Sequence, residues 1–399
     1  MIRMIKFELK KLFSNSIVIG SIAVLLLICF FILQACCFNN SATSTVLPDG
    51  TQLSGRQAIV YNQTIAEKYA GDFTDDTIAK MVTDFSKDYP NEYSQMVGGD
   101  VANSTLPSTY LYLTMFIPPA NYDEIAQDAI AHGSSIPPLT NAGLVSIEDY
   151  GTAYIDKPLQ CGYNDSWAYF FTGFCGPTIA IAFPVLIVLV IAISTVFSGE
   201  YSSKMDALIL TTRYGKNRVI IAKLLTSMVF ATLLVAGVFI LYCIAFGVHY
   251  GLLGWNADIQ TNLGLSLLGV EIPMNNLQLI FFGLMIVWLA GIFTAAITAM
   301  ISAITKSPFS SLIVAFAVFM APWILRQILP ENTLRDILLI FPANAVNVQE
   351  VLLLPVNAQS IYFNQPLAPT LSILLGTLIA LLASSVIAYK SFSNHQTIG

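Results

Sequence analysis

The sequence predicts an all-helical membrane protein with six transmembrane helices and a mostly helical domain inserted between the first two. Hydrophobic residues make up 55% of the 399 residues and charged residues only 11%, whereas soluble domains carry roughly 25% charged residues. Six apolar runs each reach the length of about 20 residues that a helix needs to cross a hydrocarbon core. The basic residues fall on alternate connections between these runs.

The basic residues predict the orientation of the spans, because Lys and Arg favour the cytoplasmic side of short connections. They cluster before the first span and between the second and third, whereas the connections 248–276 and 330–367 together hold a single Arg. We therefore expect a multi-pass protein with both termini in the cytoplasm. The predicted spans are residues 17–37, 174–196, 219–247, 277–304, 309–329 and 368–389.

The long segment 38–167 is predicted to be an extracytoplasmic domain. It is acidic, with 16 Asp and Glu against 5 Lys and Arg, and it is long enough to bury a core of its own. Helical patterns occur near 54–70, 74–97 and 122–132. Two interpretations stay open, a solubilising cap and a domain that engages a substrate or partner.

Three cysteines would lie near the outer end of the bundle. Cys36 and Cys37 end the first span, and Cys161 precedes the second. A disulfide between these regions and unpaired thiols packed at a helix end both remain open.

The predicted spans contain no Asp or Glu, and their two basic residues, Lys223 and Arg326, lie near span ends. We expect both to extend their charges toward the membrane surface. Ion-coupled transporters usually carry ionisable residues in mid-membrane, so this composition disfavours an ion-driven mechanism. The chain also lacks the glycine-rich GxxxxGK[ST] loop that cradles nucleotide phosphates, and it shows no catalytic or metal-ligand spacing.

Polar residues that could line a translocation path are few. Thr294, Thr298 and Ser302 form a hydroxyl stripe on the fourth span, and Asn344 lies in the connection 330–367. The stripe fits two interpretations: hydroxyls bonded to their own helix backbone in a packed interface, or a weakly polar wall of a pathway.

Two amphipathic segments are predicted on the cytoplasmic side. Residues 1–16 form a basic helix whose apolar face suits the membrane interface. Residues 198–217 form a second helix, with Glu200 and Lys204 as an i,i+4 ion pair and Gly215 at its end. This second helix is either a surface turn or a docking helix for a partner.

The second segment resembles the signature of permeases of the type-2 exporter family of ABC transporters, in the branch with a large extracellular domain after the first span. The family's Gly is absent near Ser203 and Lys204. The matching residues are, in order, Glu200, Asp206, Leu208, Ile209, Gly215, Lys216, Arg218 and Lys223.

The resemblance implies a permease subunit of an ATP-driven exporter in a bacterial cell membrane. Residues 1–16 would be an elbow helix, and 330–367 an outer loop with a re-entrant segment. A cytoplasmic ABC ATPase dimer would bind ATP and Mg²⁺ and dock on 198–217, and a second permease, identical or different, would complete the transporter. The residues implied in ATPase coupling are Glu200, Lys204, Met205, Asp206, Leu208, Ile209, Arg213, Gly215, Lys216 and Arg218.

Two other functions remain as alternatives, a membrane sensor or assembly protein and an ion-coupled carrier. We expect no enzymatic activity or cofactor in this chain, and partners that are protein and membrane lipid rather than nucleic acid. The substrate stays open among peptides, antibiotics and lipid-like molecules.

Overall fold

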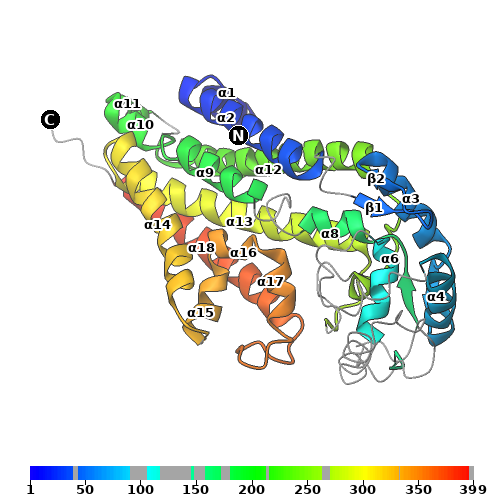
Figure 1. Ribbon diagram of the computed structural model, residues 1–399. Coiled ribbons are helices and arrows are strands. Elements are labelled where there is room, and N and C mark those ends of the chain that lie inside the picture. The colour runs from blue at the N-terminus through cyan, green and yellow to red at the C-terminus, as the bar shows by residue number, and fades with distance from the viewer. Residues whose placement is uncertain are drawn as a thin grey trace. The chain divides into compact units, whose positions relative to one another are not determined.

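The chain divides into two compact units in a computed structural model (Figure 1). Unit 1 comprises Met1–Leu33, Gly173–Ile244 and Ile280–Gly399, and unit 2 comprises Gln34–Thr172 and Ala245–Leu279. The structure describes residues 1–38, 44–89, 106–116, 145–147, 158–171, 180–212, 215–262, 270–331 and 333–394.

Six helices in the described part of the chain are long and apolar enough to cross a membrane, which confirms the predicted number of spans. The first part of the predicted second span, 174–179, lies outside the described residues. The six candidate spans are Ser16–Ala35, Ala182–Ser202, Asn217–Tyr250, Asn276–Ile304, Pro308–Ile328 and Ala368–Ser393. Their main helices are α2 (Ser16–Ile32), α9 (Ala182–Ile193), α12 (Ile220–Tyr250), α13 (Asn276–Ile304), α14 (Pro308–Ile328) and α18 (Ala368–Ser393).

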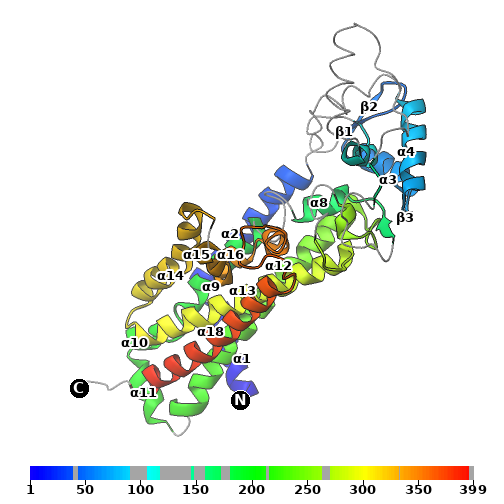
Figure 2. The same cartoon turned by 90° about the horizontal axis from the view of Figure 1, so that it is seen from below.

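Helix α13 is a central helix of unit 1, and α2 is a peripheral one. The most apolar window of α13 is 67% buried, against 17% for α2. Small side chains at four-residue spacing, Ala295, Ala299 and Ala303, are almost completely buried on α13 and allow close helix packing in lipid. Figure 2 shows α13 and α18 running side by side, and Ser391 of α18 donates a hydrogen bond to the carbonyl oxygen of Ala303.

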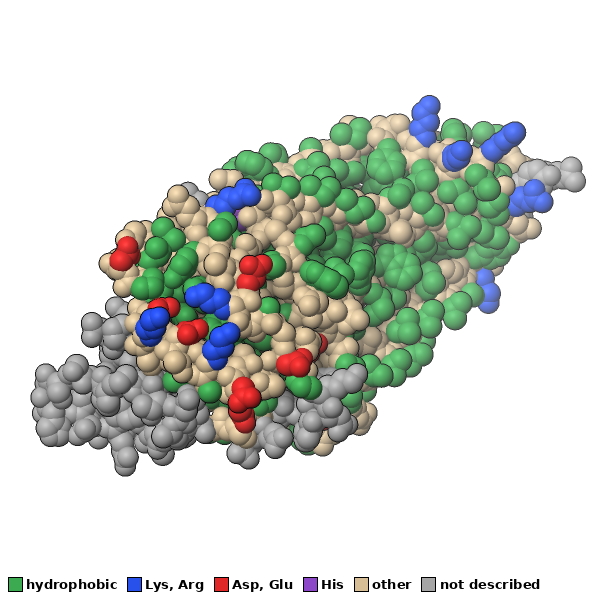
Figure 3. Space-filling view, turned by 90° about the vertical axis from the view of Figure 1, so that its right-hand side faces the viewer, with side chains coloured by type: hydrophobic (Ala, Val, Ile, Leu, Met, Phe, Trp, Pro, Cys, Tyr) green, Lys and Arg blue, Asp and Glu red, His purple; other side chains and the backbone are tan. Residues whose placement is uncertain are grey.

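Short helices flank the spans at the two ends of unit 1. Helix α1 (Ile2–Phe13) precedes α2, whose first turn is capped by Asn15 through a 3.0 Å bond from the Ile17 amide. Helices α10 (Ser198–Ser202) and α11 (Met205–Thr211) follow α9, and a π-helical turn, Gly215–Val219, leads into α12. Figure 3 shows one group of Lys and Arg side chains that has no Asp or Glu among it and lies next to many hydrophobic side chains.

The described residues of the connection between α14 and α18 fold into four short helical pieces. They are α15 (Thr333–Ile337), a 3₁₀ turn (Leu338–Ile340), α16 (Pro342–Ala345) and α17 (Val348–Leu353). The α16 piece packs against α14, and the 3₁₀ turn packs against α18. These short helices therefore form a cover on the two spans that they connect.

The prediction that Arg326 extends its charge toward the membrane surface is wrong. Its side chain is only 5% exposed, and its two terminal nitrogens donate to both carboxylate oxygens of Glu350, each at 2.7 Å. Because the planar guanidinium matches a carboxylate in this two-bond geometry, the pair satisfies a charge that is withdrawn from water. Arg326 thus connects the end of α14 to α17.

Unit 2 combines short helices with two small sheets. Strands β1 (Ser44–Val46) and β2 (Gln52–Ser54) pair antiparallel, as do β3 (Gly71–Phe73) and β4 (Leu159–Cys161). The described helical segments include α3 (Arg56–Glu67), α4 (Asp75–Asp88), α6 (Ser108–Leu111), α8 (Asp165–Phe171) and the 3₁₀ turns Tyr112–Phe116 and Ile259–Thr261. Helices α3 and α4 lie within two predicted helical patterns, and the third pattern, 122–132, lies outside the described residues.

The connection between α12 and α13 contributes to unit 2, which the sequence did not predict. Asn164 donates to the hydroxyl and carbonyl oxygens of Thr261 at 3.0 Å and accepts from Asn276 at 2.6 Å. The buried indole of Trp167 donates to the carbonyl oxygen of Leu253 at 2.8 Å. These bonds satisfy buried polar groups and hold two distant parts of the sequence together.

Cys161 is a free thiol in the structure, so the disulfide considered between it and Cys36 or Cys37 is not formed. Cys161 is buried, and burial raises the pKa of its thiol to about 12. The side chains of Cys36 and Cys37 are outside the part that the structure describes.

Asp165 gives unit 2 an expected pH dependence. Burial raises the pKa of its carboxyl from 3.8 to about 6, although the hydroxyl of Ser108 donates to it. The unfolded chain therefore loses this proton at lower pH than the folded one, and the stability of unit 2 falls as the pH rises from about 4 to about 6.

We predict that Asp165→Asn stabilises unit 2 near neutral pH by on the order of 2 kcal/mol. The asparagine oxygen still accepts from Ser108, but the half-buried negative charge is gone. Denaturant-dependent hydrogen exchange of α3 and α4 in the purified chain measures this, with the exposed Asp76→Asn as the control. Equal stability of the variant and the wild type at neutral pH would contradict this interpretation.

Candidate functional site

Lys223 lies one turn inside α12, and its side chain is completely buried. Its ammonium group donates to Glu200 at 2.7 Å, to Glu8 at 2.9 Å and to the carbonyl oxygen of Val196 at 3.1 Å. An ammonium group has three donors, so each one has an acceptor. The prediction that Lys223 extends toward the membrane surface is therefore wrong.

Glu200 shares its carboxylate between two lysines. Its Oε1 atom accepts from Lys223 and also from Lys11 of α1, at 2.5 Å. The Glu200 side chain is 5% exposed and that of Lys11 54% exposed. We call Glu8, Lys11, Glu200 and Lys223 the ion cluster; its two positive and two negative charges offset each other.

The predicted i,i+4 pair between Glu200 and Lys204 does not form among the described contacts. The backbone of Lys204 has φ of 56°, in the left-handed region, and it separates α10 from α11. In one continuous helix, Glu200 and Lys204 would lie on the same face. The break at Lys204 removes that arrangement. The predicted single helix is thus two short helices at an angle.

The ion cluster connects three elements that are far apart in the sequence. Glu8 and Lys11 come from α1, Glu200 from α10 and Lys223 from α12. Figure 1 shows α1, α10 and α11 at the same end of unit 1. Because removal of one member leaves a buried charge without its partner, such a cluster strongly favours one arrangement of the three elements.

Helix α10 also contacts the ends of α13 and α18. The Ser302 hydroxyl of α13 accepts from the amides of Phe197 and Ser198 at 3.0 Å. The Tyr201 hydroxyl donates to the carbonyl oxygen of Ala303 at 2.9 Å, and the Phe197 ring contacts Phe392 of α18. Helix α10 is thus held by α1, α12, α13 and α18.

Helix α11 presents an apolar surface beside this junction. Met205 is 44% exposed and Leu208 60% exposed. Ile209 is half-buried, Thr212 is exposed and Asp206 is buried. The predicted face of Met205, Leu208, Ile209 and Thr212 therefore points at least partly away from the rest of unit 1.

Gly215 is required by close contact rather than by a helix end. Helix α11 ends at Thr211, and a Cβ atom on Gly215 would lie 1.6 Å from the carbonyl oxygen of Ile209. The turn that follows α11 can therefore approach its backbone only with glycine here. Arg218 is exposed, whereas Arg213 and the side chain of Lys216 lie outside the described residues.

The residues suggested for a pathway are all buried in helix contacts. Thr294 donates to the carbonyl oxygen of Ala290 in its own helix at 2.8 Å, and Thr298 is 2% exposed. Ser302 contacts α10, as described above. Asn344 donates to the carbonyl oxygens of Pro322 and Leu338. These contacts favour the packing interpretation over a pathway wall.

Sequence reasoning missed Glu8 and Lys11. Helix α1 was interpreted as a membrane-surface helix, but Leu12 is buried, and Glu8 and Leu9 are half-buried against the protein. A signal was present: Glu8 is the single acidic residue of a basic helix, placed one turn before Leu12. In the described residues, no group of three His, Cys, Asp or Glu could hold a metal ion.

We predict that Lys223→Met lowers the free energy of unfolding of the purified chain by about 3 to 5 kcal/mol, because Glu8 and Glu200 then lose a buried partner. Thermal unfolding in detergent checks this, with the exposed Lys10→Met of α1 as the matched control. The double variant Lys223→Met with Glu200→Gln should regain part of the loss. Additive effects of the two changes would show that the pair does not interact.

A protein-family model matches nearly the whole chain. The family model described as ABC-2 family transporter protein matches residues 4–396. No curated protein and no solved structure matches the chain. The match covers the six spans, the inserted segment and the ion cluster. The chain belongs to the ABC-2 transporter family, as a membrane-spanning permease.

Proposed function

We propose that this chain is the permease subunit of an ATP-driven exporter and that its ATPase partner docks on α10 and α11. A permease of this family works with an ABC ATPase. The observation that carries the proposal is the exposed apolar surface of α11 beside a junction where α10 is fixed to four other helices.

The arrangement suits the transmission of force. An ATPase that seats against Met205 and Leu208 would move α11 and, with it, α10. The ion cluster then passes the motion to α1 and α12, and Ser302 passes it to α13. Because these ion pairs and hydrogen bonds link α10 to α1, α12 and α13, the four helices move together.

The energy comes from the partner in this proposal. ATP and Mg²⁺ bind to the cytoplasmic ATPase dimer, and this chain contributes no catalytic group. A second permease, identical or different, completes the transporter. Membrane lipid surrounds the apolar faces of α2, α14 and α18, which leave many large side chains exposed.

The orientation follows from the charges. Both termini and α10–α11 lie in the cytoplasm, and unit 2 lies outside the cell membrane of a bacterium. The excess of Asp and Glu in 38–167 suits cationic cargo such as a peptide. Antibiotic and lipid-like cargo are the other substrate classes that the apolar spans accommodate.

We predict that Leu208→Asp abolishes copurification of the ATPase and the ATPase activity that the permease stimulates. The charge would be buried without a partner when the apolar face is covered. Expression and thermal stability should stay unchanged, because the side chain is 60% exposed. Leu334→Asp, at a leucine of α15 that is 53% exposed, is the control. Normal ATPase binding by Leu208→Asp would rule out docking on this face.

We predict that a membrane-impermeant thiol reagent labels a cysteine introduced at Asp49 in intact cells and does not label one at Lys6. Both positions are exposed, and with the six native cysteines replaced by serine the difference reports the side of the membrane. Permeabilised cells, where both should react, provide the control. The reverse pattern would invert the proposed orientation.

A further inference from the structure

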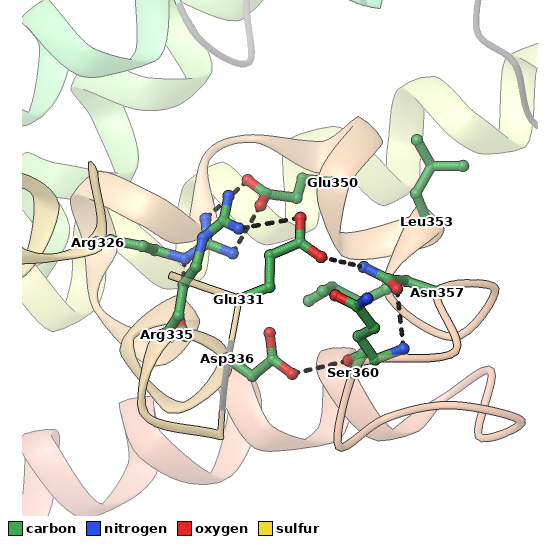
Figure 4. A pocket seen from close by; sticks show the side chains of 10 residues that line it. Arg326, Glu331, Arg335, Asp336, Glu350, Leu353, Asn357 and Ser360 are labelled. Atoms are coloured by element: carbon green, nitrogen blue, oxygen red, sulfur yellow. Dashed lines mark hydrogen bonds and ion pairs between the residues drawn. The ribbon is translucent and has the colours of Figure 1, made fainter. Parts of the chain in front are cut away.

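A small polar cavity lies in the connection between α14 and α18 (Figure 4). Its volume is about 110 Å³, enough for a small polar group but not for a whole drug-sized ligand. The wall includes charged side chains from α14, α15 and α17 and polar side chains from 357–360. The charged lining residues are Arg326, Glu331, Arg335, Asp336 and Glu350.

The two arginines of this cavity are already paired with carboxylates. Arg326 forms the two-bond pair with Glu350, and Arg335 pairs with Glu331 at 3.2 Å. Each guanidinium therefore offsets one carboxylate. One negative charge is left in the wall, and it belongs to Asp336.

Asp336 is 6% exposed and uses one oxygen to hold the loop. Its Oδ2 atom accepts from the Ser360 hydroxyl and from the Ile361 amide, both at 2.9 Å. Its Oδ1 atom accepts no hydrogen bond from the described residues. Figure 4 shows this second oxygen directed toward the side of the cavity where Glu331 lies.

We propose that the cavity binds a primary ammonium group. Such a group has one positive charge and three N–H donors. Asp336 supplies the charged acceptor, and Glu331, Asn357 and Gln359 supply further oxygens around the same space. The ammonium belongs to an amine whose remaining atoms lie outside, because the cavity is too small for them.

Other ligand classes fit less well. An anion would meet the carboxylate of Asp336 while the arginines are engaged with Glu331 and Glu350. A divalent cation prefers several carboxylates in one shell, and no group of three His, Cys, Asp or Glu in the described residues is placed to hold a metal. A quaternary ammonium has the charge but no N–H donor.

Two sources could deliver the ammonium, an aminophospholipid headgroup or a soluble amine. Apolar side chains are exposed on the same connection and on the adjoining end of α14, with Ile328 74%, Ile337 43% and Ile361 40% exposed. Acyl chains could cover this surface when a lipid headgroup occupies the cavity. The proposal does not depend on the ATPase or on the direction of transport.

The test measures lipid bound to the purified full chain by mass spectrometry, with equimolar phosphatidylethanolamine and phosphatidylcholine. The two headgroups carry the same positive charge, but three methyl groups replace the three N–H donors in phosphatidylcholine, so it can neither donate nor fit as closely. We expect about tenfold more bound phosphatidylethanolamine, the ratio that one charge-assisted hydrogen bond supports, and competition by free ethanolamine. If ethanolamine binds but the lipid shows no preference, the ligand is a soluble amine. Equal binding of both lipids without any effect of ethanolamine would overturn the proposal.

Asp336→Asn is the matched variant. Its amide oxygen can keep the bonds from Ser360 and Ile361, while its NH₂ group replaces the acceptor in the cavity. We expect the tenfold preference to disappear and unfolding to stay unchanged, and Asp76→Asn, an exposed acid in unit 2, should keep the preference. A preference retained in Asp336→Asn would overturn the proposal, as would stronger competition by Ca²⁺ than by ethanolamine. The comparison of the two lipids on the wild type holds even if the variant folds poorly.

Discussion

The buried ammonium group of Lys223 is the constraint on which the arrangement at one end of unit 1 depends. A charge withdrawn from water must be paired and fully hydrogen-bonded, or it destabilises the fold by several kcal/mol. The three acceptors of Lys223 come from α1, α10 and the residue Val196 between α9 and α10. The position of α12 therefore determines where α1 and α10 can lie.

A second buried charge acts in a similar way on the α14–α18 connection. Arg326 is held by Glu350, so the short helix α17 follows the end of α14. Between such charged junctions the spans contact one another through small and apolar side chains, as α13 does with its row of alanines. Unit 1 therefore combines charged junctions at helix ends with helix interfaces made of small and apolar side chains.

The sequence predicted the parts of the fold that depend on local composition. Hydropathy located the six spans because a lipid environment demands long apolar runs, and the order of residues around Glu200 indicated the family. The sequence did not predict the partners of Lys223 and Arg326. Their positions near span ends predict side chains that extend to the aqueous surface. Glu8 lies 215 positions from Lys223 in the chain, and no local pattern reports a contact over that distance.

Two further differences have local causes that a pattern does not contain. The left-handed backbone at Lys204 divides the predicted helix. A spacing of four residues therefore no longer places Glu200 and Lys204 on the same helical face. Unit 2 takes its buried hydrogen bonds from two segments, with Asn164 and Asn276 112 positions apart. The domain predicted from the single segment 38–167 thus also includes Ala245–Leu279.

We expect α1 and α10–α11 to move as one body, because the ion cluster joins them. Spin labels at Lys10 and Ser202, both exposed and outside the proposed docking face, measure this directly in the transporter with its ATPase, with the nucleotide-free state compared with an ATP-trapped state. The account predicts that the distance between the labels stays the same in the two states and becomes variable in Lys223→Met. A change in the wild type by about the length of one helical turn, roughly 5 Å, would contradict it.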